Sequence, residues 1–156
     1  MEIRGKWWGK VAAAVFQGTS ALSLDGKGRL SVPARQRDAL AELSAGQLTL
    51  TRHPAGCLLV FPRPEWESFR GRLLGLPMQA DGWRRLFLGS AVDVDIDSSL
   101  RILVPPELRL AAGLDKDVLL MGMGHRLELW DSARYALHEA QVLSSPMPAA
   151  IQDFVF

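Results

Sequence analysis

The stretch LDGKGRLSVP at residues 24–33 decides the fold, because IDSSLRILVP at residues 96–105 repeats its pattern 72 positions later. Each copy has an aspartate, an arginine four positions on, and a valine–proline pair three positions after the arginine. Apolar and polar residues alternate before each copy, which indicates a half-buried strand. Each proline occupies a plausible first helical position, and a helical pattern follows it. The chain therefore contains two copies of one unit.

A second strand pair and a second helix complete each unit. In the first unit, QLTLTRH and CLLVF form a predicted hairpin around residues 54–56. In the second unit, the predicted hairpin is formed by DVLLMGMGHRLELW, with Gly122 and Gly124 in the turn. The predicted helices that follow the two hairpins are PEWESFRGRLLGL and DSARYALHEAQV. Asp131 is the predicted N-cap of the second of these helices. GWRRLFLG, residues 82–89, is a predicted linking helix.

A unit of about 70 residues that is built from two short hairpins does not easily close a hydrophobic core alone. Two units that exchange hairpins pair their strand edges instead. The predicted fold class is α+β, a pseudo-twofold swapped-hairpin (double-split) β-barrel of two β-β-α-β-β-α units with flanking helices. Both units form one globular domain, divided as an N-terminal extension, a first unit with linker helix, a second unit and a C-terminal tail (residues 1–14, 15–86, 87–143 and 144–156).

Composition excludes several classes of protein. The chain of 156 residues is 48% hydrophobic and 22% charged, as is ordinary for a globular protein. No apolar run approaches the ~20 residues that span a bilayer. The apolar run at residues 11–16 is shorter than the roughly 7–15 residues of a secretory signal core. A single cysteine, Cys57, excludes internal disulfides and favours a reducing compartment. We therefore expect a cytoplasmic protein without a membrane partner.

The formal net charge of +1 conceals an uneven distribution. Residues 15–86 contain ten basic and six acidic residues, whereas residues 87–156 contain five basic and ten acidic residues. Residues 1–14 add three basic residues and one acidic residue. A polyanion, if bound, is therefore expected on the first half of the chain.

The first repeated turn has two interpretations. Asp25 and Arg29 flank a three-residue loop whose glycines take the positive φ that such a loop needs, so the pair is able to latch the turn. A second interpretation is nucleic-acid contact, because Lys27 lies at the loop tip with Arg35 and Arg37 further on. Lysine and arginine at such positions suit phosphates, and arginine also binds guanine in the major groove.

The sequence gives no sign of an enzyme. The three histidines fall in separate predicted elements without metal-ligand spacing (His53, His125 and His138). No serine has the surroundings of a nucleophile elbow. Three aspartates alternate on the polar side of a predicted strand and are interpreted as a solvated face (Asp93, Asp95 and Asp97). We expect no catalytic residue, no cofactor, no metal and no small-molecule substrate.

Several ordered motifs resemble the MraZ family of bacterial transcription regulators: FQGTSALSLDGKGRLSVPARQR, LLVFPRPEW, LFLGSA, DSSLRILVPPELR and LELWD. The resemblance covers residues 16–130 and continues weakly into the last helix. It implies an AbrB-like swapped-hairpin barrel, ring-shaped homo-oligomers, and binding of double-stranded promoter DNA upstream of the family's own division and cell-wall gene cluster. The resemblance therefore also implies a protein that is associated with the nucleoid. The implied DNA contacts are Asp25, Lys27, Gly28 and Arg29, to which we add Arg35 and Arg37.

Two departures from the family pattern leave alternatives open. The second copy, DSSLR, lacks Lys-Gly, so Arg101 is either architectural or a weaker DNA contact. Residues 1–14 precede the usual family start, and Val15 stands where an initiator would fall. They are either an over-long start or a basic, Trp-bearing arm.

Two rival functions also follow from the sequence. One is a ring-forming protein-interaction module with weak or lost DNA binding, which the acidic second half favours. The other is an antitoxin-like regulator. The duplicated unit argues against it, because we expect such antitoxins to carry one unit and to dimerise.

Overall fold

The computed structural model describes residues 16–154. The N-terminal extension predicted at residues 1–14, and its two interpretations, lie outside this range, as does the end of the C-terminal tail. Within the described range, every helix is too short or too polar to cross a membrane.

The elements follow the predicted order β-β-α-β-β-α, twice. The first unit consists of β1 Thr19–Ser23, β2 Arg29–Ser31, α2 Ala34–Ser44, β3 Gln47–Arg52, β4 Leu58–Pro62 and α3 Arg63–Leu74. A linker of η1 Met78–Ala80 and α4 Asp81–Gly89 follows. The second unit consists of β5 Val92–Asp95, β6 Arg101–Leu103, α5 Pro106–Ala111, β7 Asp117–Gly122, β8 Leu127–Asp131 and α6 Ser132–Ser144. A short helix, α7 Ala149–Gln152, ends the described chain.

Strands pair between the two units. Six strands form one antiparallel sheet in the order β1-β7-β8-β4-β3-β5, and β2 pairs with β6 in a separate ribbon. Thus β1 of the first unit lies on β7 of the second, and β5 of the second lies on β3 of the first. The predicted α+β class is confirmed, and strands of the two units pair with each other. Among the described residues, β1 and β5 end the sheet without pairing to each other, so closure into a barrel stays a prediction.

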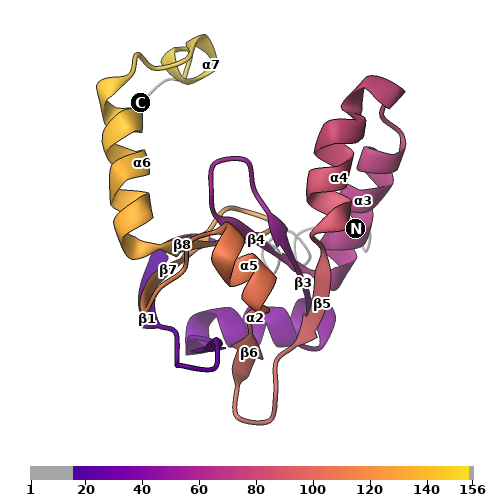
Figure 1. The fold of residues 1–156 in the computed structure, drawn as a ribbon, viewed down its shortest axis with the longest axis vertical. Helices are drawn as coiled ribbons and strands as arrows, with labels where there is room; N and C mark the ends of the chain where they lie inside the picture. The colour runs from indigo at the N-terminus through magenta and orange to yellow at the C-terminus, as the bar shows by residue number, and fades with distance from the viewer. Residues whose placement is uncertain (1–15, 155–156) are drawn as a thin grey trace, which may run out of the picture.

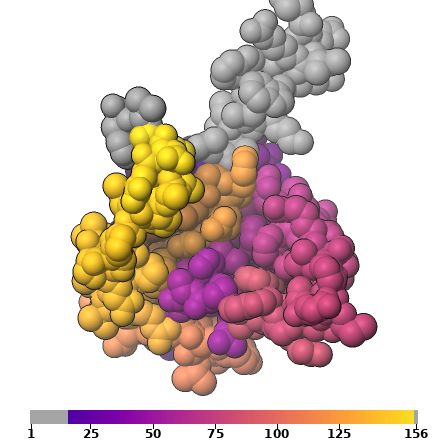
Figure 2. Space-filling view, turned by 90° about the horizontal axis from the view of Figure 1, so that it is seen from above, coloured from indigo at the N-terminus to yellow at the C-terminus, as the bar shows by residue number. Residues whose placement is uncertain are grey.

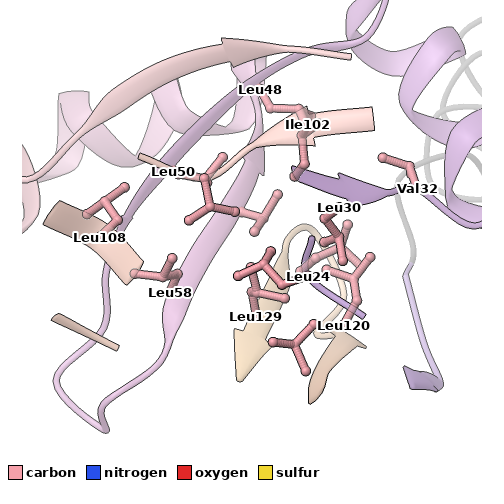
Figure 3. Packing of buried hydrophobic residues seen from close by; sticks show 14 of the residues in the cluster. Leu24, Leu30, Val32, Leu48, Leu50, Leu58, Ile102, Leu108, Leu120 and Leu129 are labelled. Carbon is pink, nitrogen blue, oxygen red and sulfur yellow. The ribbon is translucent and has the colours of Figure 1, made fainter. Parts of the chain in front are cut away.

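The two units share one hydrophobic core. In the β2–β6 ribbon, Leu30 pairs with Ile102, and both side chains are buried. These residues occupy equivalent places in the two copies, so the pseudo-twofold axis passes through this pair. Figure 3 shows Leu30 and Ile102 among buried side chains that come from both units, including Leu24, Leu48, Leu50, Leu58, Leu108, Leu120 and Leu129. Because neither unit buries these side chains alone, we infer that they fold together.

Helices of each unit project from the sheet as two arms (Figure 1). The first arm, α3–α4, packs on the sheet through an aromatic cluster (Phe61, Trp66, Phe69 and Phe87). The second arm, α6–α7, is anchored where Tyr135 and His138 pack against Trp130. Figure 2 shows the two arms from above, at opposite sides of the molecule. The side chain of Asp131 accepts a hydrogen bond from the Arg134 N–H at 3.1 Å, which confirms the predicted N-cap of α6.

Two local predictions are wrong in detail. Gly122 ends β7 rather than supplying the turn, and only Gly124 has a positive φ, of 81°. A Cβ at Gly122 would collide with the backbone of Phe16 and Gln17, so the glycine allows the chain before β1 to cross closely there. Pro33 and Pro105 are the N-caps of α2 and α5 rather than their first residues, and the first residue of α5 is Pro106.

Candidate nucleic-acid interface

Asp25 organises the first turn, between β1 and β2. Its Oδ1 atom accepts hydrogen bonds from the backbone N–H of Lys27 at 2.9 Å and of Arg29 at 2.8 Å. Its Oδ2 atom accepts one from Arg29 Nε, also at 2.8 Å. The backbone N–H of Gly28 donates to the Asp25 carbonyl at 3.0 Å. The latch predicted between Asp25 and Arg29 is therefore present, and it fixes the conformation of the whole loop.

These hydrogen bonds determine the protonation of Asp25. Donation by the backbone N–H of Arg29 is the largest cause that lowers the pKa of Asp25, to about 2. The Arg29 side chain and the Lys27 N–H lower it further, while partial desolvation opposes them. Asp25 is therefore a carboxylate at neutral pH and accepts hydrogen bonds from the Lys27 N–H, the Arg29 N–H and Arg29 Nε.

The latch leaves cationic groups facing solvent. Only the Nε atom of Arg29 donates to Asp25, and its two terminal nitrogens make no hydrogen bond among residues 16–154. Lys27 is exposed, and within the same range its ammonium group has neither a hydrogen bond nor an ion pair. A latched loop and a contact loop are therefore compatible, because different nitrogens serve the two roles.

Arg109 of α5 packs against this turn, although it was not among the residues predicted from the sequence. Gly28 has a φ of 83°, and a Cβ there would lie 2.6 Å from Arg109 Nε and 3.0 Å from the Val104 carbonyl oxygen. Arg109 Nε donates to that carbonyl at 3.0 Å. Arg109 also lines a surface groove with Asp25, Gly26 and Lys116. The first turn is thus supported by a helix of the second unit and has further basic side chains beside it.

The second turn has the same backbone design. Asp97 Oδ1 accepts from the N–H groups of Ser99 at 2.8 Å and Arg101 at 2.9 Å. Arg101 Nε lies 3.7 Å from Asp97 Oδ2, so the side-chain latch is looser than in the first turn. Leu100 takes the position of Gly28 with a φ of 64°, which is unfavourable for a leucine. This turn lacks both the lysine and the glycine of the first copy.

The ribbon places the two arginines on one face. Arg29 pairs with Leu103, and Ser31 pairs with Arg101. Side chains two positions apart in a strand point the same way, so Arg29 and Arg101 lie on the side opposite the buried Leu30. The backbone also joins the turns, because the N–H groups of Val32 and Val104 donate to the carbonyls of Leu100 and Gly28. Arg101 is thus near the first site, and both of its interpretations remain open.

The two α2 arginines lie apart from the first turn. Arg35 is exposed and donates to the Ser20 hydroxyl of β1 at 3.1 Å. Arg37 lines a groove with Asp97 and Leu100, beside the second turn. Arg37 and Arg109 occupy equivalent positions 72 residues apart, and each lies beside the turn of the other unit. Aligning the two repeats beyond the prolines would have identified Arg109.

Other candidate chemistry is not assembled within the described residues. No group of three or more histidine, cysteine, aspartate or glutamate side chains there has a metal-binding arrangement. Cys57 is buried, and desolvation raises the pKa of its thiol well above the ordinary value. Asp93 and Asp95 are exposed, and each lies 3.7 Å from a nitrogen of Arg63. These aspartates belong to surface ion pairs.

The fold and the turn define a class: a duplicated strand-exchanging protein that presents a basic, aspartate-latched hairpin. Comparison with known proteins identifies its family. A family model described as "MraZ protein, putative antitoxin-like" matches residues 15–85 and 87–153. The chain therefore belongs to the MraZ family.

Relatives within this family are highly similar to the chain. A protein named "Transcriptional regulator MraZ" from Methylibium petroleiphilum is 61% identical over 146 residues, which cover 94% of this chain and all of the relative. The protein of that name from Leptothrix cholodnii is 64% identical, over 90% of this chain and 97% of the relative. The one from Delftia acidovorans is 60% identical, over 91% of this chain and all of the relative.

Proposed function

We propose that this chain is a transcription regulator that binds double-stranded DNA through its first turn and is not an enzyme. Relatives about 60% identical along almost their whole length carry the name transcriptional regulator, which supports the class. The cationic groups of Lys27 and Arg29, held on a latched loop, support DNA as the partner. The proposed site consists of Asp25, Lys27, Gly28 and Arg29, with Arg109 as its support and Arg35, Arg37 and Arg101 as outer contacts.

The loop chemistry carries this proposal. Three hydrogen bonds to one carboxylate fix the loop before any ligand arrives, so little conformational entropy is lost on binding. The Arg29 terminal nitrogens suit two acceptors of guanine or one phosphate, and Lys27 suits a phosphate. Gly26 is exposed and has no side chain to hold the backbone away from a groove, since a Cβ there would meet nothing within 4 Å.

A single turn provides few contacts, so the proposal includes several subunits acting together. In a ring homo-oligomer, adjacent turns reach successive copies of a short repeated site, and later contacts become intramolecular. The proposed target lies upstream of the protein's own gene, in the division and cell-wall gene cluster, and the proposed location is the cytoplasmic nucleoid. The family resemblance is the support for ring, gene cluster and location.

The proposal is tested by competition between two duplexes. Fluorescence anisotropy compares a labelled duplex from upstream of the gene with a shuffled duplex of equal composition. We expect preference for the native duplex with wild-type protein, and loss of that preference with Arg29→Ala. Arg101→Ala, the equivalent change in the other turn, tests whether that arginine contributes as an outer contact.

Equal and weak binding of both duplexes would contradict the proposal. It would favour the alternative of a protein-interaction module, for which the acidic second half and the exposed apolar arms are the specific observations.

A further inference from the structure

A cavity lies beside helix α3, where the turns of two hairpins meet it. Its volume is about 340 Å³, within the range of about 300–1,000 Å³ that is usual for small-molecule sites in proteins. Phe69 of α3, Phe87 of α4, His53 of the β3–β4 turn and Arg126 of the β7–β8 turn are among the residues that line it. None of its described lining residues belongs to the grooves beside the two repeated turns. The cavity is therefore separate from the proposed DNA contact.

Aromatic rings form one wall of this cavity. The rings of Phe61 and Phe69 are stacked, with 5.1 Å between centroids and 27° between planes. Phe87 meets Phe69 edge-on, at 5.3 Å and 88°. Phe69 and Phe87 are only partly buried, so their rings remain open to a ligand. An aromatic ligand would stack on these rings or meet them edge-on, in addition to burying apolar surface.

Two arginines stand beside the aromatic wall with unused hydrogen-bonding capacity. The guanidinium of Arg72 lies 5.8 Å from the centroid of the Phe69 ring and has no ion pair among residues 16–154. Arg126 Nε is buried and has no hydrogen-bond partner in the same range, while a terminal nitrogen of Arg126 lies 3.5 Å from Glu128 Oε2. Glu65 is the one carboxylate among the described lining residues. Because a buried donor without a partner is costly, an anionic acceptor at Arg126 would be favourable.

His53 adds a neutral hydrogen-bond donor to the cavity. Its Nδ1 atom accepts a hydrogen bond from the Ala55 N–H at 2.9 Å. Desolvation is the largest cause that lowers the pKa of His53, so the imidazole is neutral at neutral pH. A neutral imidazole that accepts at Nδ1 carries its proton on Nε2. Nε2 is thus available to donate to a ligand.

The repeat shows that folding does not require this combination of residues. Both units have an aromatic residue that anchors a helix to the sheet. Phe69 and Arg72, however, correspond to His138 and Gln141, which lie 69 positions later. An arginine beside a phenylalanine ring at this place is therefore a feature of the first unit alone.

We propose that this cavity binds a small organic anion built on an aromatic ring. The ring packs on the phenylalanine wall, and the anionic group, such as a carboxylate, sulfonate or phosphate, accepts hydrogen bonds from Arg126 and Arg72. The ligand is bound without being converted, so the proposed class of protein is unchanged. The inference goes beyond DNA binding and does not depend on it.

The experiment titrates the full chain with two fluorescent probes that share one aromatic body. Anilinonaphthalenesulfonate carries a sulfonate, and phenylnaphthylamine lacks it. We expect anilinonaphthalenesulfonate to saturate at one molecule per chain. Arg72→Gln and Arg126→Gln should each weaken its binding at least about fivefold and change binding of the neutral probe by less than about twofold, because only the sulfonate forms charge-assisted hydrogen bonds. Arg70→Gln, on the same helix but outside the lining, is the control and should bind both probes as wild type does.

A second pair of variants tests the location without removing a charge. Met123 lines the cavity and is 43% exposed, so Met123→Trp is tolerated at the surface and fills part of the space. We expect this variant to lose binding of both probes. Met78 is 80% exposed and lies outside the lining, so Met78→Trp should bind both probes as wild type does.

Three results would overturn the inference. They are wild-type binding that does not saturate at one molecule per chain, arginine variants that affect both probes equally or neither, and a Met123→Trp protein that binds as wild type does. No arm of the experiment contains DNA, so its outcome is independent of the proposed function.

Discussion

At the scale of single residues, the two copies of the turn solve one backbone problem in different ways. The fourth position needs a positive φ, which Gly28 adopts without cost and Leu100 adopts against its preference. Only the glycine also has another side chain, that of Arg109, packed where a Cβ would be. Equivalent substitutions in the two turns should therefore have different consequences.

We expect Gly28→Ala to lower the free energy of unfolding by at least about 1 kcal/mol, because alanine is strained at this φ and its Cβ displaces Arg109. Leu100→Gly should change stability by less than about 1 kcal/mol, since relief of strain offsets the greater freedom of glycine in the unfolded chain. Urea unfolding measures both. Equal destabilisation by the two changes would contradict the assigned difference between the turns.

The protonation of Asp25 provides a second test at this scale. Its folded pKa of about 2 is below the ordinary value of 3.8, so the latch contributes its full stability above the ordinary value. That contribution is lost as the pH falls through about 2. Carbon NMR of the Asp25 carboxyl group should give a midpoint near pH 2. Arg29→Ala should raise it only partway, because the backbone donors remain. An ordinary midpoint in the wild-type protein would show that the latch is absent in solution.

At the scale of elements, the pairing of strands between the two units predicts that they unfold as one cooperative structure. The β2–β6 ribbon joins them through the buried pair Leu30 and Ile102. Ile102→Ala should lower stability by about 2–5 kcal/mol through lost burial and a cavity. Leu103→Ala, the exposed neighbour on the same strand, is the control and should change stability by less than about 0.5 kcal/mol.

Hydrogen exchange followed by mass spectrometry at increasing denaturant measures where that loss appears. In the wild type, segments β3–β4 and β7–β8 should lose protection at one common denaturant concentration. In Ile102→Ala, both segments should again lose protection together, at a lower denaturant concentration. If only β7–β8 shifted in the variant, the units would be independent and the shared core would not govern folding.

The repeat and its periodicities predicted the element order, the N-cap at Asp131 and the latch in the first turn, because these depend on residues close in sequence. Other features depend on long-range approach. The sequence around Gly122 predicts a turn, whereas the structure shows a strand residue that is crossed closely by the backbone at Phe16. Arg109 lies 81 positions from Gly28 and meets it only because the units exchange strands. Arg35 and Arg37, neighbours on α2, point to different partners.

At the scale of the whole molecule, the two candidate surfaces are separate. The basic turns lie on one side of the sheet, and the arms lie on the other (Figure 1). In the proposed ring, each copy would present its turn to DNA. Binding strength would then depend on the number of turns that engage at once.

The central claim, that the first turn contacts DNA, is tested most directly by the salt dependence of binding. Lys27→Ala removes an ammonium group without disturbing the latch, and Ser99→Ala is the equivalent change in the second turn. The measurement is the slope of the logarithm of affinity against the logarithm of salt concentration on the upstream duplex. We predict that Lys27→Ala weakens binding and makes this negative slope shallower by about 1, while Ser99→Ala leaves the slope unchanged. Wild-type affinity and slope in Lys27→Ala would contradict the claim.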